Sequence, residues 1–147
     1  MSHKSILLVE DNPSDIALTK RAFEKSHIAN ELIIAQDGQQ ALDYLLGREG
    51  HPPLPELPAL VLLDLKLPII DGLGVLQQLR AHASTRRLLV VVLTSSVEQQ
   101  DLAASYDLGI NSYIRKPVDF AQFAATITQL GLYWLVMNET PPKVTTS

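Results

Sequence analysis

The sequence contains no cysteine, and only 5% of its 147 residues are aromatic. Without cysteine, disulfide bonds, zinc ribbons and thiol catalysis are excluded. A basic excess is also absent, because 16 acidic residues outnumber 12 basic ones and give a formal net charge of −4. This balance argues against a dedicated nucleic-acid-binding protein, in which clustered positive charge supplies much of the affinity.

Long hydrophobic runs are missing as well, since no apolar run approaches the roughly 20 residues of a membrane-spanning helix. The N-terminal segment MSHKSILLVED turns acidic after about five apolar residues and is too short for a secretory signal. The remaining composition, with 46% hydrophobic and 19% charged residues, is typical of a globular chain. We therefore expect one cytoplasmic domain with no membrane or nucleic-acid partner.

Short aliphatic runs alternate along the chain with longer segments of helical spacing. The runs lack polar alternation, which is typical of strands covered on both faces of a parallel sheet. Strands are predicted at 5–9, 31–35, 59–63, 88–93 and 111–114. Helices are predicted at 13–27, 38–47, 72–82, 97–108 and 119–137. This alternation predicts an α/β fold, a doubly wound five-stranded parallel sheet with strand order 2-1-3-4-5.

Helix-capping residues support these boundaries. Asn12 precedes Pro13 at the first helical position, and Asp15 lies in the first turn. Three later helices are expected to start after Asp37, Asp71 and Ser96.

Polar residues follow the predicted strands at the point where each strand ends. Glu10 and Asp11 follow the first strand, Asp64 the third, Thr94 the fourth and Lys116 the fifth. Because the carboxyl ends of parallel strands share one edge of the sheet, these side chains should converge. Two carboxylates about 4 Å apart repel by about 4 kcal/mol at an effective dielectric constant near 20, so the cluster requires a proton or a cation.

Carboxylate oxygens without a nearby imidazole or thiolate favour a magnesium-like ion. Such an ion, the Lys116 ammonium and the Thr94 hydroxyl around one carboxylate predict a phosphoryl-transfer site. Asp64 would be the nucleophile, and its product would be an acyl phosphate.

Four segments resemble the receiver domains of two-component response regulators, the CheY-like family: ILLVEDNPSD, DLKLPIIDG, VVLTSS and YIRKP. The resemblance covers about residues 4–130, nearly the whole predicted fold. It implies one receiver domain over 4–137, and the polar segment 138–147 is expected to be a disordered tail.

The resemblance implies a role for each residue of the metal site. Asp64 matches the phosphorylated aspartate. Asp11 would bind Mg²⁺ directly and Glu10 through water, while Lys66 would offer its backbone carbonyl. The Lys66 side chain departs from the asparagine often found there, which leaves the lifetime of the phosphorylated state open.

The resemblance also implies a conformational switch. Thr94 would contact the phosphoryl group and Lys116 would pair with it, across a cis peptide bond to Pro117. Ser95 is small, as access to the aspartate requires, and Tyr113 matches the aromatic switch residue. Phosphorylation would then remodel the surface around the fourth helix, fifth strand and fifth helix.

A closer similarity lies outside the site. The insert GREGHPPLPELP, the segment KPVDFAQF and the ending QLGLYWLVMNE resemble small response regulators partnered with bacterial phytochrome histidine kinases. We expect output through protein contact or phosphoryl relay. The apolar residues Leu132, Leu135 and Val136 predict a homodimer through the helix 4–strand 5–helix 5 surface and the C-terminal arm.

Three alternatives remain. A haloacid-dehalogenase-type phosphatase needs a second aspartate two residues after the nucleophile, where this chain has Lys66. A flavodoxin needs a Ser/Thr/Gly-rich phosphate loop, whereas EDNPSD is acidic. A phosphorylation-independent adaptor with the receiver fold typically loses one member of the set Asp11, Asp64, Thr94 and Lys116, which is intact here.

Overall fold

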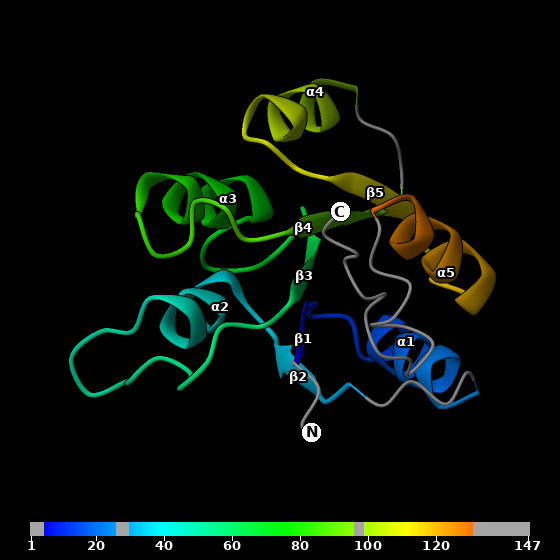
Figure 1. Ribbon diagram of the computed structural model, residues 1–147, viewed down its shortest axis with the longest axis horizontal. Coiled ribbons are helices and arrows are strands. Elements are labelled where there is room, and N and C mark those ends of the chain that lie inside the picture. Colours follow the sequence, from blue (N-terminus) through cyan, green and yellow to red (C-terminus); the bar gives the residue numbers. More distant parts are fainter. Residues whose placement is uncertain (1–4, 26–29, 96–98, 131–147) are drawn as a thin grey trace, which may run out of the picture.

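The structure, a computed structural model, describes residues 5–25, 30–95 and 99–130. Strands and helices alternate over these residues (Figure 1). The strands are β1 (Ile6–Val9), β2 (Leu32–Ala35), β3 (Leu60–Asp64), β4 (Val90–Thr94) and β5 (Ser112–Arg115). The helices are α1 (Pro13–Lys25), α2 (Gly38–Leu45), α3 (Gly72–Ala81), α4 (Gln99–Asp107) and α5 (Phe120–Gln129).

All neighbouring strands pair in parallel, in the order β2-β1-β3-β4-β5, which confirms the predicted fold class. Val9 lies opposite Leu63 in the register, so the residues after them, Glu10 and Asp64, leave the sheet side by side. Asp64 in turn lies opposite Leu93, one residue before Thr94. The register therefore brings the ends of the three central strands to one place.

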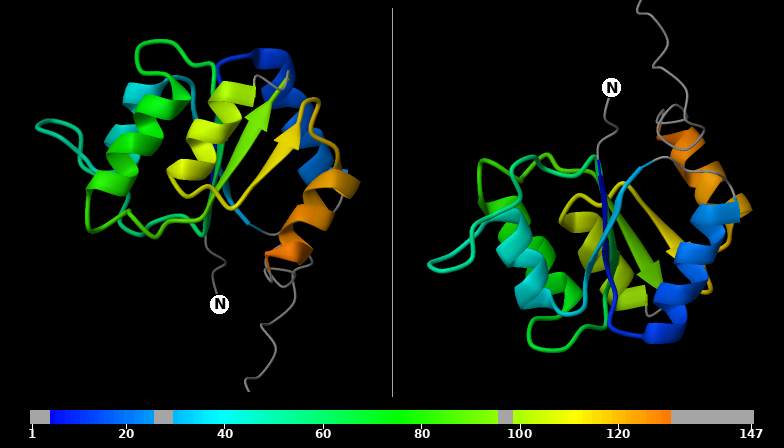
Figure 2. Two further views of the ribbon diagram at one scale, coloured as in Figure 1. Left: turned by 90° about the horizontal axis from the view of Figure 1, so that it is seen from above. Right: turned by 90° about the horizontal axis from the view of Figure 1, so that it is seen from below.

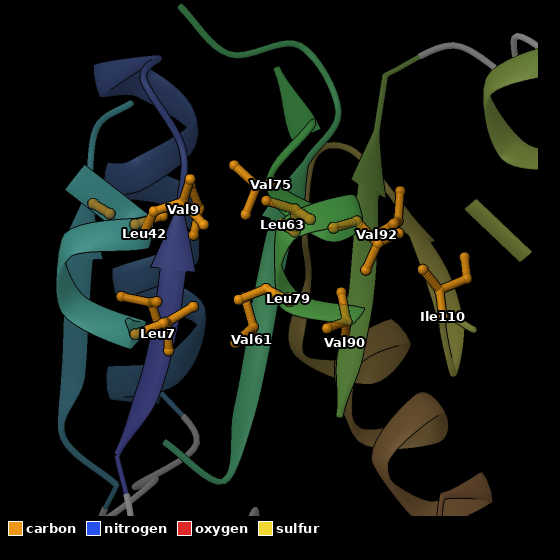
Figure 3. Packing of buried hydrophobic residues seen from close by; sticks show 14 residues of the cluster. Leu7, Val9, Leu42, Val61, Leu63, Val75, Leu79, Val90, Val92 and Ile110 are labelled. Atoms are coloured by element: carbon orange, nitrogen blue, oxygen red, sulfur yellow. The ribbon is translucent and has the colours of Figure 1, made fainter. Parts of the chain in front are cut away.

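Helices cover both faces of the sheet. Helices α1 and α5 lie on one face, and α2, α3 and α4 lie on the other (Figures 1 and 2). Alternate strand residues point to opposite faces: Leu8 packs in the cluster with Phe23 and Phe123, whereas Leu7 packs in the cluster with Leu42 (Figure 3). Because both faces are buried, the strands need continuous apolar runs, as the sequence has.

The predicted boundaries agree with these elements to within two residues wherever both ends are described. The predicted caps are also confirmed: the Asn12 side chain accepts from the backbone N–H of Ser14, and Asp37 and Asp71 cap α2 and α3. Ser96, the last predicted turns of the fifth helix and the predicted tail 138–147 lie outside the described residues.

Among the described residues, no helix combines the length and apolar character needed to cross a membrane.

The proline-rich insert, residues 47–58, has local structure of its own. Arg48 and His51 form an antiparallel bridge, and the Arg48 guanidinium lies 2.7 Å from Asp43 on α2. This hydrogen bond lowers the pKa of Asp43. The insert projects beyond α2 (Figure 2), and most of its residues are exposed, although Pro58 at its end is buried.

Arg80, on α3, forms hydrogen bonds with two other segments near the start of β4. Its guanidinium donates hydrogen bonds to the carbonyl oxygens of Leu108 and Gly109 (both 2.8 Å), Leu88 (2.9 Å) and Arg86 (3.0 Å). Burial lowers the pKa of Arg80. The five N–H groups of the planar guanidinium suit such a set of carbonyls.

The Arg80→Met variant should test this structural role. It leaves several carbonyl groups without a donor, so we expect the free energy of unfolding to fall by about 3 kcal/mol in urea denaturation. Arg80→Lys should recover only part of the loss, because an ammonium cannot reproduce the fork of donors. Arg87→Met removes an exposed arginine nearby and serves as the control. Equal stability of the Arg80 and Arg87 variants would contradict this assignment.

Candidate functional site

A cleft of about 540 Å³ lies at the carboxyl ends of β1, β3 and β5. Glu10 directly follows β1, Asp64 is the last residue of β3, and Lys116 directly follows β5. Its lining residues come from these strand ends, from the residue after β4 and from the start of α1: Glu10, Asp11, Asn12, Pro13, Asp15, Asp64, Lys66, Ser95 and Lys116. The predicted convergence of the acidic residues and the lysine is therefore observed.

Three carboxylates in this cleft form a potential metal site. Oxygen atoms of Glu10, Asp11 and Asp64 all lie within 4.8 Å of one another. Glu10 is 1% exposed and Asp64 is 6% exposed, whereas Asp11 is exposed at the cleft mouth. Clustered hard oxygens, two buried and one open to solvent, fit a divalent cation that keeps part of its water shell.

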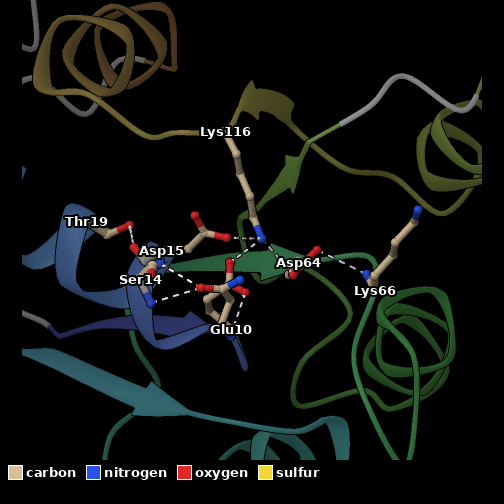
Figure 4. Close-up of polar contacts among 8 residues, drawn as sticks. Glu10, Ser14, Asp15, Thr19, Asp64, Lys66 and Lys116 are labelled. Carbon is tan, nitrogen blue, oxygen red and sulfur yellow. Dashed lines mark hydrogen bonds and ion pairs between the residues drawn. The ribbon is translucent and has the colours of Figure 1, made fainter.

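Lys116 places a positive charge among these carboxylates. Its Nζ lies 2.5 Å from Oε1 of Glu10, 2.8 Å from Oδ2 of Asp64 and 3.1 Å from Oδ2 of Asp15 (Figure 4). Its backbone N–H donates to the carbonyl of Thr94, which joins the end of β4 to the site. The peptide bond between Lys116 and Pro117 is cis, as expected.

Burial and charge shift the pKa values of this cluster in a consistent way. Burial raises the pKa of Glu10 to about 7; Lys116 opposes this shift and the Asp64 charge adds to it. Burial also lowers the pKa of Lys116, but its bonds to Asp64 and Glu10 outweigh that effect and raise the pKa overall. The ammonium therefore remains charged, but its single positive charge cannot neutralise all of the surrounding carboxylates.

Both oxygens of Asp64 are held in place. Oδ1 accepts from the backbone N–H of Lys66 at 3.0 Å, and Oδ2 accepts from Lys116. The start of α3 approaches the end of β3 so closely that a Cβ on Gly72 would overlap the backbone of Asp64 and Leu65. Glycine at this position therefore lets the helix begin beside the carboxylate.

The loop from Asp64 to Gly72 contains a strained turn that the sequence did not reveal. Ile69 has φ of 71°, in the left-handed region, and the N–H of Ile70 bonds to the carbonyl of Pro68 at 2.8 Å. This is a three-residue γ-turn, and positive φ is costly for a β-branched side chain. Ile69 is also 77% exposed.

Two predicted residues are not part of the lining of the cleft. Thr94 is buried at the end of β4, and Tyr113 on β5 is 37% exposed. Asp15 was missed as a site residue, since the sequence assigned it only to the first turn of a helix. The available signal was its position: that helix begins at the carboxyl end of β1, directly beside the acidic pair.

The model of the response regulator receiver domain family matches residues 6–128. The chain belongs to this family. It is 42% identical over 136 residues to a probable methanogenesis regulatory protein, FilR2, of Methanothrix harundinacea (92% of this chain, 86% of the relative). It is 37% identical over 132 residues to the response regulator Rcp1 of Synechocystis (90% and 89%).

Solved structures of response regulators share the fold closely. The bacteriophytochrome response regulator RtBRR is 51% identical, with a TM-score of 0.82, over 95% of this chain and 85% of that one. The Mn²⁺-bound form of Rcp1 is 36% identical, with a TM-score of 0.72, over 95% and 99%. A divalent cation is therefore known in a receiver of this type, and the acidic cluster here fits such an ion.

Removing Lys116 should expose the charge imbalance of the site. In Lys116→Met, buried Glu10 and Asp64 lose their counter-ion, so the free energy of unfolding should fall by about 3 kcal/mol at pH 8. Magnesium should stabilise this variant more than the wild type, since the cation replaces the missing charge. Urea denaturation with and without magnesium measures both effects, and Lys20→Met on exposed α1 surface is the control. A variant as stable as the control would refute the argument.

Proposed function

We propose that this receiver accepts a phosphoryl group from a histidine kinase on Asp64, with Mg²⁺, and signals through a change in its surface. One observation carries the proposal: the Asp64 carboxylate is buried among metal-competent oxygens on one side and the Lys116 ammonium on the other. That arrangement suits transfer of an anionic group onto a carboxylate.

The chain's own groups divide the chemistry among them. An oxygen of Asp64 attacks phosphorus, the bond from phosphorus to the donor imidazole nitrogen breaks, and that nitrogen keeps the electron pair. The Lys66 N–H holds Oδ1 of Asp64, and the Lys116 ammonium, which lies beside Oδ2, is proposed to pair with the phosphoryl group. Glu10, Asp11, Asp64 and the Lys66 carbonyl are the proposed Mg²⁺ ligands, Glu10 through water. Bound there, Mg²⁺ supplies positive charge that offsets the negative charge of the transferring group.

The proposed donor is a histidine kinase of the phytochrome type. The similarity to a bacteriophytochrome response regulator at 51% identity supports this choice. The switch is proposed to work through Thr94, which contacts the phosphoryl group, and Tyr113, which changes position in response. Tyr113 is only partly exposed on an edge strand, so a modest movement would change the area it presents.

The residue at position 66 argues against the alternative of a dehalogenase-type phosphatase. Lys66 stands two residues after Asp64, where a dehalogenase-type enzyme needs an acid, and its backbone N–H is already bonded to the acceptor. We infer that the domain catalyses only its own phosphorylation and dephosphorylation. An adaptor that works without phosphorylation would not need the buried Asp64 and Lys116 pair.

Incubation with acetyl phosphate and magnesium, followed by intact mass measurement, tests the proposal. We expect one added phosphoryl group on the wild type, and none after chelation or in Asp64→Asn, since the nucleophile or the metal is then lost. Asp71→Asn alters an exposed carboxylate that caps α3 and should be modified like the wild type. Equal modification of Asp64→Asn would defeat the proposal, and transfer from a purified phytochrome kinase would test the donor.

We also propose a homodimer through α4, β5, α5 and the C-terminal arm. Tyr106 on α4 is 49% exposed and Tyr113 on β5 is 37% exposed, so aromatic surface lies open on two of these elements. The apolar residues of the predicted arm, Leu132, Leu135 and Val136, lie outside the described residues.

Light scattering should detect this dimer and its loss. Truncation after Gly131 and the Tyr106→Ser variant should each shift the protein from dimer to monomer, because both remove apolar contact area. Leu18→Ser on α1, where the leucine is 40% exposed, is a matched control that should remain dimeric. An unchanged mass after truncation would sink the idea.

A further inference from the structure

The three carboxylates that hold Lys116 fall into two kinds. Glu10 and Asp64 also belong to the acidic metal cluster, together with Asp11. Asp15 does not belong to it, although its Oδ2 lies 3.1 Å from the same ammonium and its side chain is only 25% exposed. Asp15 is therefore the one carboxylate of the three that a cation in this cluster would leave available to Lys116.

A divalent cation and the Lys116 ammonium would compete for the same oxygens. Glu10 and Asp64 would then face two positive groups at once, and those groups repel each other at such short range. A lysine side chain has a flexible four-carbon stem, so its ammonium can shift by a small distance at little cost. Asp15 is already in contact with the ammonium, so a shift in that direction keeps a carboxylate partner (Figure 4).

Asp15 is well fixed for this role. Its backbone N–H donates to the Asn12 side chain at 3.1 Å, and its carbonyl accepts from the Thr19 hydroxyl at 2.9 Å. It also lies in the first turn of α1, where the helix dipole favours a negative charge. The backbone that carries the carboxylate is therefore held at a fixed position beside the ammonium.

We propose that Asp15 is a positioning residue that holds the Lys116 ammonium when a divalent cation binds Glu10, Asp11 and Asp64. It thereby lets one small site contain both positive charges before the phosphoryl group arrives. The inference rests on the proposed function, in which such a cation is required. It adds to that function a residue that contacts neither the cation nor the phosphoryl group.

A double-mutant cycle in magnesium binding, measured by isothermal titration calorimetry, tests this role. In the wild-type background Asp15→Asn should weaken magnesium binding about fivefold, because Lys116 then competes for Glu10 and Asp64. In the Lys116→Met background the same change should alter binding by less than about twofold, the screened effect of one charge at a distance. Lys116→Met alone should bind magnesium more tightly than the wild type.

Controls separate positioning from charge and from folding. Glu24→Gln removes one exposed carboxylate from the same helix and should leave magnesium binding unchanged. If Asp15→Asn does not fold, Asp15→Ala provides the same cycle, since alanine has the highest helix propensity. Equal losses in both backgrounds, or no loss in the wild-type background, would overturn the inference.

The outcome is independent of the phosphorylation experiment. Coupling between Asp15 and Lys116 without any modification by acetyl phosphate would support the positioning role and reject the proposed function. Modification of Asp64 without such coupling would reject only the positioning role.

Discussion

The site depends on one buried ammonium placed among more carboxylates than it can neutralise. Lys116 contacts Glu10, Asp15 and Asp64 within 3.1 Å, and Asp11 adds a further negative charge at the cleft mouth. Without the lysine, two nearly inaccessible carboxylates would face each other without compensation. With it, part of this negative charge is compensated, and the excess that is left fits the proposed divalent cation.

The parallel sheet makes this arrangement possible at little cost to the core. Strands β1, β3 and β4 are fully buried and almost entirely aliphatic, so the only charged residue among them is the last one of β3, Asp64. Glu10 follows β1 directly, and the register places it beside Asp64. Charges therefore collect at one end of the sheet, where the loop N–H groups of Asn12 and Lys66 donate to Glu10 and Asp64.

The sequence predicted what depends on pattern and topology. The aliphatic runs and the caps at Asn12, Asp37 and Asp71 located the elements, and strand-end positions then brought Glu10, Asp64 and Lys116 together. It did not predict contacts that depend on side-chain reach or on local backbone strain. Asp15 reaches Lys116 across 101 positions of sequence, and nothing in the segment LPIID specifies that Ile69 adopts positive φ. Neither feature has a periodic or compositional signature.

Two basic residues, Arg80 near the start of β4 and Lys116 near its end, are held by different kinds of oxygen atom. Arg80 binds carbonyl oxygens, whose dipoles are fixed by the backbone and attract no competing cation strongly. Lys116 binds carboxylates, for which protons and divalent cations also compete. An arginine held by carbonyls therefore stays where it is, whereas a lysine held by carboxylates can be displaced. The second arrangement, unlike the first, allows the proposed binding of an ion or of a phosphoryl group to change the local structure at the carboxyl ends of the strands.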